Sequence, residues 1–179
     1  MIIKAFCAVA VIVSFASAGC AQAAAPCDTE QHHQFDFWIG KWKVFPNVKG
    51  ASQVATSLIE SLYAGCGIRE NWMPASGTGG GSMNTFSNVT NQWEQFWVDS
   101  GGSAVHFTGG WNGTAMVIQG LWPQAGHPNA LSRITYTPLS RGRVEQLGEF
   151  SYDDGQHWSK AFDFIYRPVK RSADRDRPR

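Results

Sequence analysis

The sequence predicts an all-β protein, a single antiparallel up-and-down barrel of about ten strands. Short runs rich in aromatic and β-branched residues follow one another along the chain, and Gly or Asn stands between most of them. Helical periodicity is nearly absent. A sheet without covering helices must curl into a barrel or split into a sandwich to bury its faces. The eight Trp residues favour a barrel, because some of these rings can then line a partly open interior.

The first 23 residues have the composition of a bacterial secretory signal peptide. Lys4 is followed by an apolar run and by small residues that end in Ala-Gln-Ala at 21–23, which is the order of a cleavable signal. We therefore expect residues 1–23 to be removed and the mature protein to be periplasmic or secreted. Lipidation of Cys20 is the alternative, because small residues also precede this cysteine. The apolar run is too short to span a membrane.

The rest of the chain is long enough for one domain with one sizeable core. Strands are expected near residues 37–45, 53–63, 67–73, 82–87, 92–99, 104–111, 114–122, 131–137, 143–151 and 158–167. The second of these segments also fits a helix, because Val54, Leu58 and Leu62 are four residues apart and form an apolar stripe. A single helix there would leave the fold class unchanged.

Two turns carry specific signals. The Asn-Gly pair at 112–113 lies between two apolar runs and predicts a two-residue hairpin in which both residues adopt a positive φ. The pattern Ser-x-Asp-x-Gly-x-x-Trp at 151–158 resembles the Asp-box turn of sialidases and other β proteins. This resemblance implies a local clasp in which Asp153 accepts backbone amides, Gly155 supplies the permissive backbone and Trp158 packs beneath. The turn occurs on unrelated folds, so it implies no activity.

Two cysteines, Cys27 and Cys66, remain after removal of the leader. An even pair in an oxidising compartment predicts a disulfide. Closing a loop of this length stabilises the fold by about 4 kcal/mol in the chain-entropy model. The bond would also tie the N-terminal segment to the barrel wall. A reactive thiol or a metal pair is the alternative, although no third ligand stands at metal-like spacing.

The net charge of the chain excludes few classes of function. The chain has a formal net charge of +1, so we expect no nucleic-acid partner. The segment 169–179 contains one Lys and four Arg against two Asp, with no aromatic residue. Such a composition predicts a disordered, solvated basic tail. Nothing after the leader is long and apolar enough to span a membrane, and the oligomeric state stays open.

Four motifs are spread along the chain. They are FDFWIGKWKV at 35–44, GC-x-x-x-E-x-W at 65–72, W-x-Q-x-W-V-D at 93–99 and RITYTPL at 133–139. Together they resemble a family of secreted bacterial lipocalin-like proteins of uncharacterised function. The resemblance covers nearly the whole mature chain and implies that residues 24–168 form a calycin-type barrel. It implies no activity.

The first motif contains Gly40-x-Trp42, the element shared with the lipocalins proper. In that fold the tryptophan fills one end of the barrel, and an arginine of the closing strand packs across it. The matching residue here is Arg167. A guanidinium over an indole contributes about 0.5 to 2 kcal/mol, so we expect this pair to act in stability before it acts in binding.

Binding residues are expected where strand alternation puts a polar group on an otherwise apolar face. The residues predicted to line a luminal site are Glu70, Trp72, Gln95, Trp97, Arg133 and Gln146. Aromatic walls with a few hydrogen-bonding anchors are typical of a small-molecule pocket, and the expected ligand is small and apolar or amphipathic. In the alternative interpretations, these groups satisfy one another inside a filled barrel, or a strand is out of phase and they face water.

No catalytic motif is found, whether a nucleophile elbow, a zinc helix or a phosphate-binding glycine loop. The sequence therefore predicts a binding protein with no catalytic residue, metal or cofactor. One alternative is a calycin-type isomerase or lyase that uses Glu70 and Arg133. A second is a filled barrel that acts as an interaction module. Haem bound through His106, if that side chain is luminal, is a third.

Overall fold

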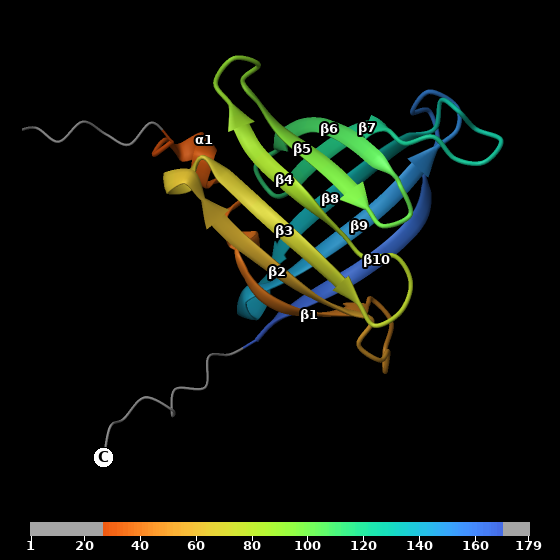
Figure 1. Ribbon diagram of the computed structural model, residues 1–179, viewed down its shortest axis with the longest axis horizontal. Helices are drawn as coiled ribbons and strands as arrows, with labels where there is room; N and C mark the ends of the chain where they lie inside the picture. Colours follow the sequence, from red (N-terminus) through yellow and green to blue (C-terminus); the bar gives the residue numbers. More distant parts are fainter. Residues whose placement is uncertain (1–26, 170–179) are drawn as a thin grey trace, which may run out of the picture.

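Ten antiparallel strands form one closed barrel in the computed structural model, which describes residues 27–169 (Figure 1). Each strand pairs with its neighbours in sequence, and the first pairs with the last. The predicted fold class is confirmed. The strands are β1 (Gly40–Pro46), β2 (Ala55–Leu62), β3 (Gly67–Pro74), β4 (Gly80–Ser87), β5 (Gln92–Asp99), β6 (Ala104–Trp111), β7 (Met116–Leu121), β8 (Leu131–Leu139), β9 (Arg143–Ser151) and β10 (Ser159–Pro168).

The predicted strand positions are confirmed to within a few residues at each end. In β2 the side chains of Ala55, Ser57 and Ile59 are buried and alternate with more exposed ones. This period of two is that of a strand, so the helical alternative for this segment is wrong. The predicted signal peptide, Cys20 and the tail from residue 170 lie outside the described residues.

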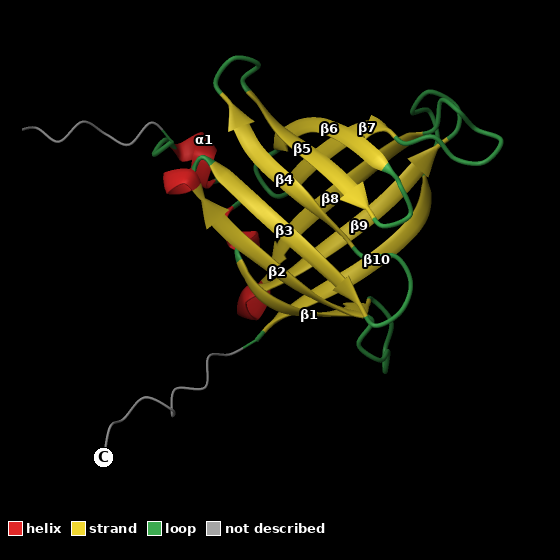
Figure 2. Cartoon of the chain, in the orientation of Figure 1, coloured by secondary structure: helices red, strands yellow, loops and turns green. Residues whose placement is uncertain are grey.

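Four short helical segments complete the described fold, and in Figure 2 they gather at one end of the barrel. They are α1 (Glu30–His33), η1 (Asp36–Trp38), η2 (Tyr63–Gly65) and η3 (Ser140–Gly142). None of the helices within residues 27–169 has the length and apolar character needed to cross a membrane.

The segment α1–η1 closes this end of the barrel from inside. Phe35 and Trp38 are fully buried, and their rings stack at 4.9 Å. Phe35 also meets Trp93 edge-on at 5.6 Å, and the Trp38 ring lies 4.7 Å from that of Tyr136. Large aromatic rings fill the space that inward-facing strand residues leave here. Aromatic side chains therefore fill the lumen at this end.

The disulfide between Cys27 and Cys66 is confirmed. Cys66 directly follows η2, and Cys27 precedes α1, so the bond fastens this closing segment to the connection between β2 and β3. Disulfides of this kind persist in oxidising compartments.

The Trp42 indole is buried in the closed end, where its Nε1 donates to the carbonyl oxygen of Trp38 at 2.9 Å. Arg167 does not pack on it, so that prediction is wrong. In the register of β1 and β10, Arg167 is opposite Lys43, and both point outward. The Arg167 guanidinium lies 4.2 Å above the ring of Phe45.

The Asn-Gly turn joins β6 to β7, but it is a four-residue connection in which only Gly113 has a positive φ, of 99°. The two-residue geometry was therefore a wrong prediction. The side chain of Asn112 explains the difference, because its Oδ1 accepts the amides of Thr114 at 3.0 Å and Ala115 at 2.9 Å. An Asn that binds the following backbone in this way replaces the tighter turn.

The clasp between β9 and β10 has the geometry that the Asp-box resemblance implies. Asp153 Oδ1 accepts the amide of His157 at 2.9 Å, and the Trp158 indole donates to the carbonyl of Gly155 at 3.0 Å. Gly155 adopts a φ of 85°. The clasp holds one of the connections at the end of the barrel opposite the helices.

Candidate functional site

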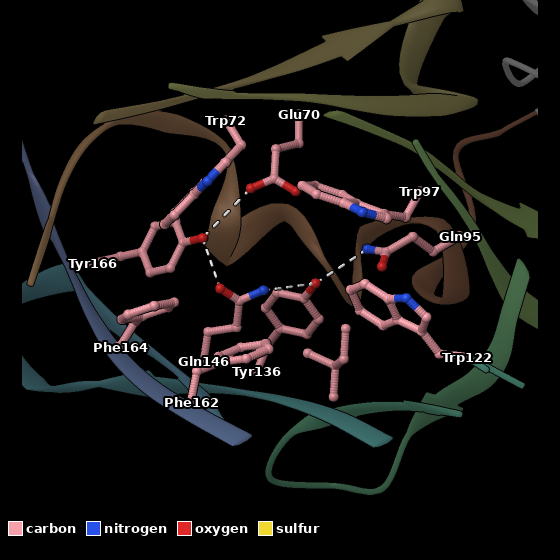
Figure 3. Close-up of a pocket in the computed structure, with 11 residues that line it drawn as sticks. Glu70, Trp72, Gln95, Trp97, Trp122, Tyr136, Gln146, Phe162, Phe164 and Tyr166 are labelled. Carbon is pink, nitrogen blue, oxygen red and sulfur yellow. Dashed lines mark hydrogen bonds between the residues drawn. The ribbon is translucent and has the colours of Figure 1, made fainter. Parts of the chain in front are cut away.

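A cavity of about 150 Å³ occupies the other half of the lumen (Figure 3). Five of the six residues predicted to line a luminal site line this cavity, and the exception is Arg133. The lining residues are Glu70, Trp72, Gln95, Trp97, Trp122, Ile134, Tyr136, Gln146, Phe162, Phe164 and Tyr166. Tyr136 also packs against Trp38, so the closing segment supports the floor of the cavity.

The floor of the cavity is polar and buried, while its wall is aromatic and half-buried. Strand alternation produces this division, because inward positions two residues apart lie at successive heights in a barrel. On β3, Glu70 belongs to the floor and Trp72 to the wall; on β5, Gln95 belongs to the floor and Trp97 to the wall. The Trp97 indole is oriented by Asp99, whose Oδ2 accepts its N–H at 3.3 Å.

Hydrogen bonds join the polar groups of the floor into a closed ring. On one side, Ser82 donates to Glu70 Oε2 at 3.2 Å, and Asn84 Nδ2 donates to the Ser82 hydroxyl at 3.0 Å. Gln95 Nε2 then donates to Asn84 Oδ1 at 2.7 Å. These bonds run between the neighbouring strands β3, β4 and β5.

The other side of the ring crosses the lumen (Figure 3). Nε2 of Gln95 and Nε2 of Gln146 both donate to the hydroxyl oxygen of Tyr136, at 3.1 and 3.2 Å. The Tyr166 hydroxyl donates to Gln146 Oε1 at 2.8 Å and lies 3.4 Å from Glu70 Oε1, which closes the ring. We call the joined residues Glu70, Ser82, Asn84, Gln95, Tyr136, Gln146 and Tyr166 the luminal ring.

The carboxyl group of Glu70 is the acidic group among the cavity-lining residues, and none of those residues is basic. It is almost fully buried. Burial raises the pKa of Glu70 to about 7, although the hydroxyl groups that contact it, including that of Ser57 at 3.1 Å, lower it in part. A buried carboxyl without a cationic partner takes up a proton more readily than one in water.

The luminal ring leaves hydrogen-bonding capacity unused on its cavity side. The Tyr136 oxygen accepts two hydrogen bonds, but no described residue accepts its own O–H. Burial raises the pKa of Tyr136 far above its usual value, so this hydroxyl stays protonated. Within the described chain, Gln95 Oε1 also accepts no hydrogen bond. A ligand in the cavity therefore meets one free donor and one free acceptor.

Arg133 lies on the outer face of the barrel, so its predicted place in the site is wrong. Its Nη2 is 2.8 Å from Glu149 Oε2, and its guanidinium lies 4.1 Å above the Trp158 ring. In β8 the buried positions are Ser132, Ile134 and Tyr136. These three residues therefore face the lumen, whereas Arg133 and Leu131 share the outward face of the strand.

His106 also points outward, so the alternative of a luminal haem ligand at this position does not hold. About half of its side chain is exposed, and its ring stacks on that of Phe96 at 4.3 Å. Across residues 27–169, no three His, Cys, Asp or Glu side chains are placed to hold one metal ion together.

Several lining residues were missed by sequence reasoning, namely Trp122, Ile134, Tyr136, Phe162, Phe164 and Tyr166. Tyr136 could have been found from the alternation of Ser132, Ile134 and Tyr136, which is as regular as the alternation of Leu131 and Arg133. Tyr166 carries no local signal, because its partners Glu70 and Gln146 come from distant parts of the sequence.

No protein-family model matches this chain, and no curated protein matches it.

Proposed function

We propose that this protein is a lipocalin-like carrier or sensor, exported to the periplasm or beyond, that binds a small, partly apolar ligand in its lumen. One observation carries the proposal. A hollow with aromatic walls lies over a buried polar floor whose Tyr136 donor and Gln95 acceptor are left unused. Such a combination of apolar surface and a few fixed polar groups is typical of ligand pockets.

The size of the cavity supports a ligand of about one ring. In another protein, a dry apolar cavity of about 150 Å³ accommodates a benzene molecule. The rings and aliphatic groups that border this volume forgo the packing contacts that they would make in a filled core. A barrel selected for stability or for a purely external interaction has no need of this hollow, which counts against the interaction-module alternative.

The alternative of an isomerase or lyase requires both Glu70 and Arg133 in the lumen, and Arg133 is not there. Arg133 is paired with Glu149 on the outer face and has no route to a substrate beside Glu70. The proposed export rests on the signal-like composition of residues 1–23 and on the disulfide. The mass of the mature protein from a periplasmic fraction tests it, with Ala24 as the expected first residue.

Native mass spectrometry of the gently extracted protein tests luminal binding. Wild type and Arg133→Met are expected to retain the same ligand mass, because Arg133 lies outside the lumen. Gln95→Leu is expected to retain less, because it removes a free acceptor of the floor and disrupts the luminal ring. The proposal fails if wild type retains no mass and its tryptophan fluorescence does not respond to single-ring compounds.

A further inference from the structure

The aromatic wall surrounds the carboxyl group of the floor. In Figure 3 the Glu70 carboxyl group lies between Trp72 and Trp97. The strand register supports this placement, since Glu70 is opposite Ser82, and Ser82 is opposite Trp97. The rings that form the wall are Trp72, Trp97, Trp122, Phe162 and Phe164. Ring faces carry negative charge density and attract cations, Trp most strongly.

Among residues 27–169, no charged side chain contacts the Glu70 carboxyl group. The neighbouring strands β2 and β4 present Ser57, Ser82 and Asn84 to it, all of which are neutral. The titratable groups that face it are the hydroxyls of Tyr166 on β10 and, further along the luminal ring, Tyr136 on β8. Both phenols are buried and neutral.

The Tyr166 hydroxyl gives Glu70 little compensation. Tyr166 has one hydroxyl proton, and the 2.8 Å distance to Gln146 Oε1 assigns the proton to that bond. The same hydroxyl lies 3.4 Å from Glu70 Oε1, so it can donate only a weak second interaction to the carboxylate. Burial without a cationic partner therefore favours the protonated carboxyl group, and a cationic ligand can substitute for that proton.

We infer that the ligand is a small organic ammonium ion, whose charged nitrogen lies against Glu70 and whose apolar part lies among the rings of Trp72, Trp97, Trp122, Phe162 and Phe164. This inference rests on the proposed luminal binding and specifies its chemistry. Binding is an exchange: the ammonium ion enters, and the Glu70 proton leaves to solvent. No bond of the ligand is made or broken.

Three probes of one size test the charge preference. Benzylamine is cationic, benzyl alcohol is neutral, and benzoate is anionic. Titration by tryptophan fluorescence at pH 8 is expected to give affinities for benzylamine at least about tenfold above those for benzyl alcohol, with benzoate weakest. A higher affinity for benzyl alcohol or benzoate would overturn the inference and leave luminal binding intact.

The pH dependence of binding supplies a second readout. Benzylamine stays protonated from pH 6 to pH 8, whereas Glu70 gains its proton as the pH falls over this range. The affinity for benzylamine is expected to fall about tenfold from pH 8 to pH 6, and that for benzyl alcohol to stay constant. Calorimetry in buffers of different ionisation enthalpy should register one proton released per benzylamine at pH 6. A pH-independent affinity for benzylamine contradicts the exchange.

Glu70→Gln assigns these effects to the carboxyl group. The amide has the same shape but no charge: its oxygen can still accept a hydrogen bond from one of the Ser57 and Ser82 hydroxyl groups, and its NH2 group can donate to the oxygen of the other. We expect it to abolish both the preference for benzylamine over benzyl alcohol and the pH dependence of benzylamine binding. Glu94→Gln, on the outward face of β5, is the matched control and should behave as wild type.

The outcomes separate the two proposals. If Glu70→Gln keeps the benzylamine preference, the ammonium ion is not held at Glu70 and the inference is wrong. If no probe binds to wild type and native mass spectrometry finds no retained ligand, luminal binding itself is wrong. The wild-type pH profile needs no variant, so the inference can be judged even if Glu70→Gln fails to fold.

Discussion

The Nε2 of Gln95 donates to the hydroxyl oxygen of Tyr136 at 3.1 Å, across the interior of the barrel. The two residues belong to β5 and β8, and β6 and β7 separate these strands in the wall. The bond therefore joins opposite parts of the sheet directly through the lumen. Together with the contact between Tyr166 and Glu70, it gives the cavity a fixed floor in place of a mobile set of side chains.

Replacing Gln95 by Leu should lower the free energy of unfolding by about 1 to 3 kcal/mol, because the buried Asn84 Oδ1 loses its donor. Urea denaturation followed by tryptophan fluorescence measures the change. Gln119→Leu, at an exposed position of β7, is the matched control and should stay within about 0.5 kcal/mol of wild type. Equal effects of the two substitutions would contradict a structural role for the luminal ring.

The stability of the ligand-free protein should fall as the pH rises through the titration of Glu70. The pKa of its carboxyl group is about 7 in the folded protein and 4.5 for an unperturbed glutamate, so the folded state binds the extra proton between these values. Stability from this group is present at low pH and lost toward higher pH, by roughly 2 to 3 kcal/mol between pH 5 and pH 8. Urea midpoints of wild type and Glu70→Gln at both pH values measure it. Parallel pH profiles would show that Glu70 does not titrate in this way.

Gly148→Ala should destabilise the barrel by about 1 to 3 kcal/mol through overpacking. A Cβ at Gly148 would lie 2.2 Å from a carbon of the Phe162 ring, because this ring packs directly over the Gly148 backbone. Thermal unfolding measures the effect, and adding Phe162→Leu should restore part of the loss. Gly110→Ala, where a Cβ meets nothing within 4 Å, is the control. A destabilisation that Phe162→Leu leaves unchanged would assign the cost to another contact.

Removing the disulfide with Cys27→Ser and Cys66→Ser should lower the free energy of unfolding by about 4 kcal/mol, the loop-closure value for cysteines with a sequence separation of 39. Because the bond fastens the segment that carries Phe35 and Trp38, near-ultraviolet circular dichroism of these rings should weaken first on heating. A single cooperative transition with unchanged midpoint would mean that ring packing alone holds the segment.

Sequence reasoning located the strands because their signals are local. Alternation and turn residues suffice to delimit a segment such as β5, where Trp93, Gln95 and Trp97 share one face. The same reasoning also placed Glu70 and Trp72 together in the lumen. Alternation says which residues share a face, however, and not which face is inside.

The errors follow from this limit. In β8 both faces contain apolar residues, and the cross-strand partner Glu149 that keeps Arg133 outside belongs to β9. Arg167 was assigned to Trp42, but the register of β10 against β1 places Tyr166 in the lumen instead. Register between the first and last strands of a barrel depends on the whole closed sheet, so no single segment of sequence specifies it.

Tyr166 closes the luminal ring, and it is almost the last described residue of the final strand. A chain that stops before β10 contains nine of the ten strands but lacks the Tyr166 hydroxyl group beside Glu70. Its sheet cannot close, so β1 and β9 remain as unpaired edges. Without β10 the lumen therefore has neither a closed wall nor a complete luminal ring.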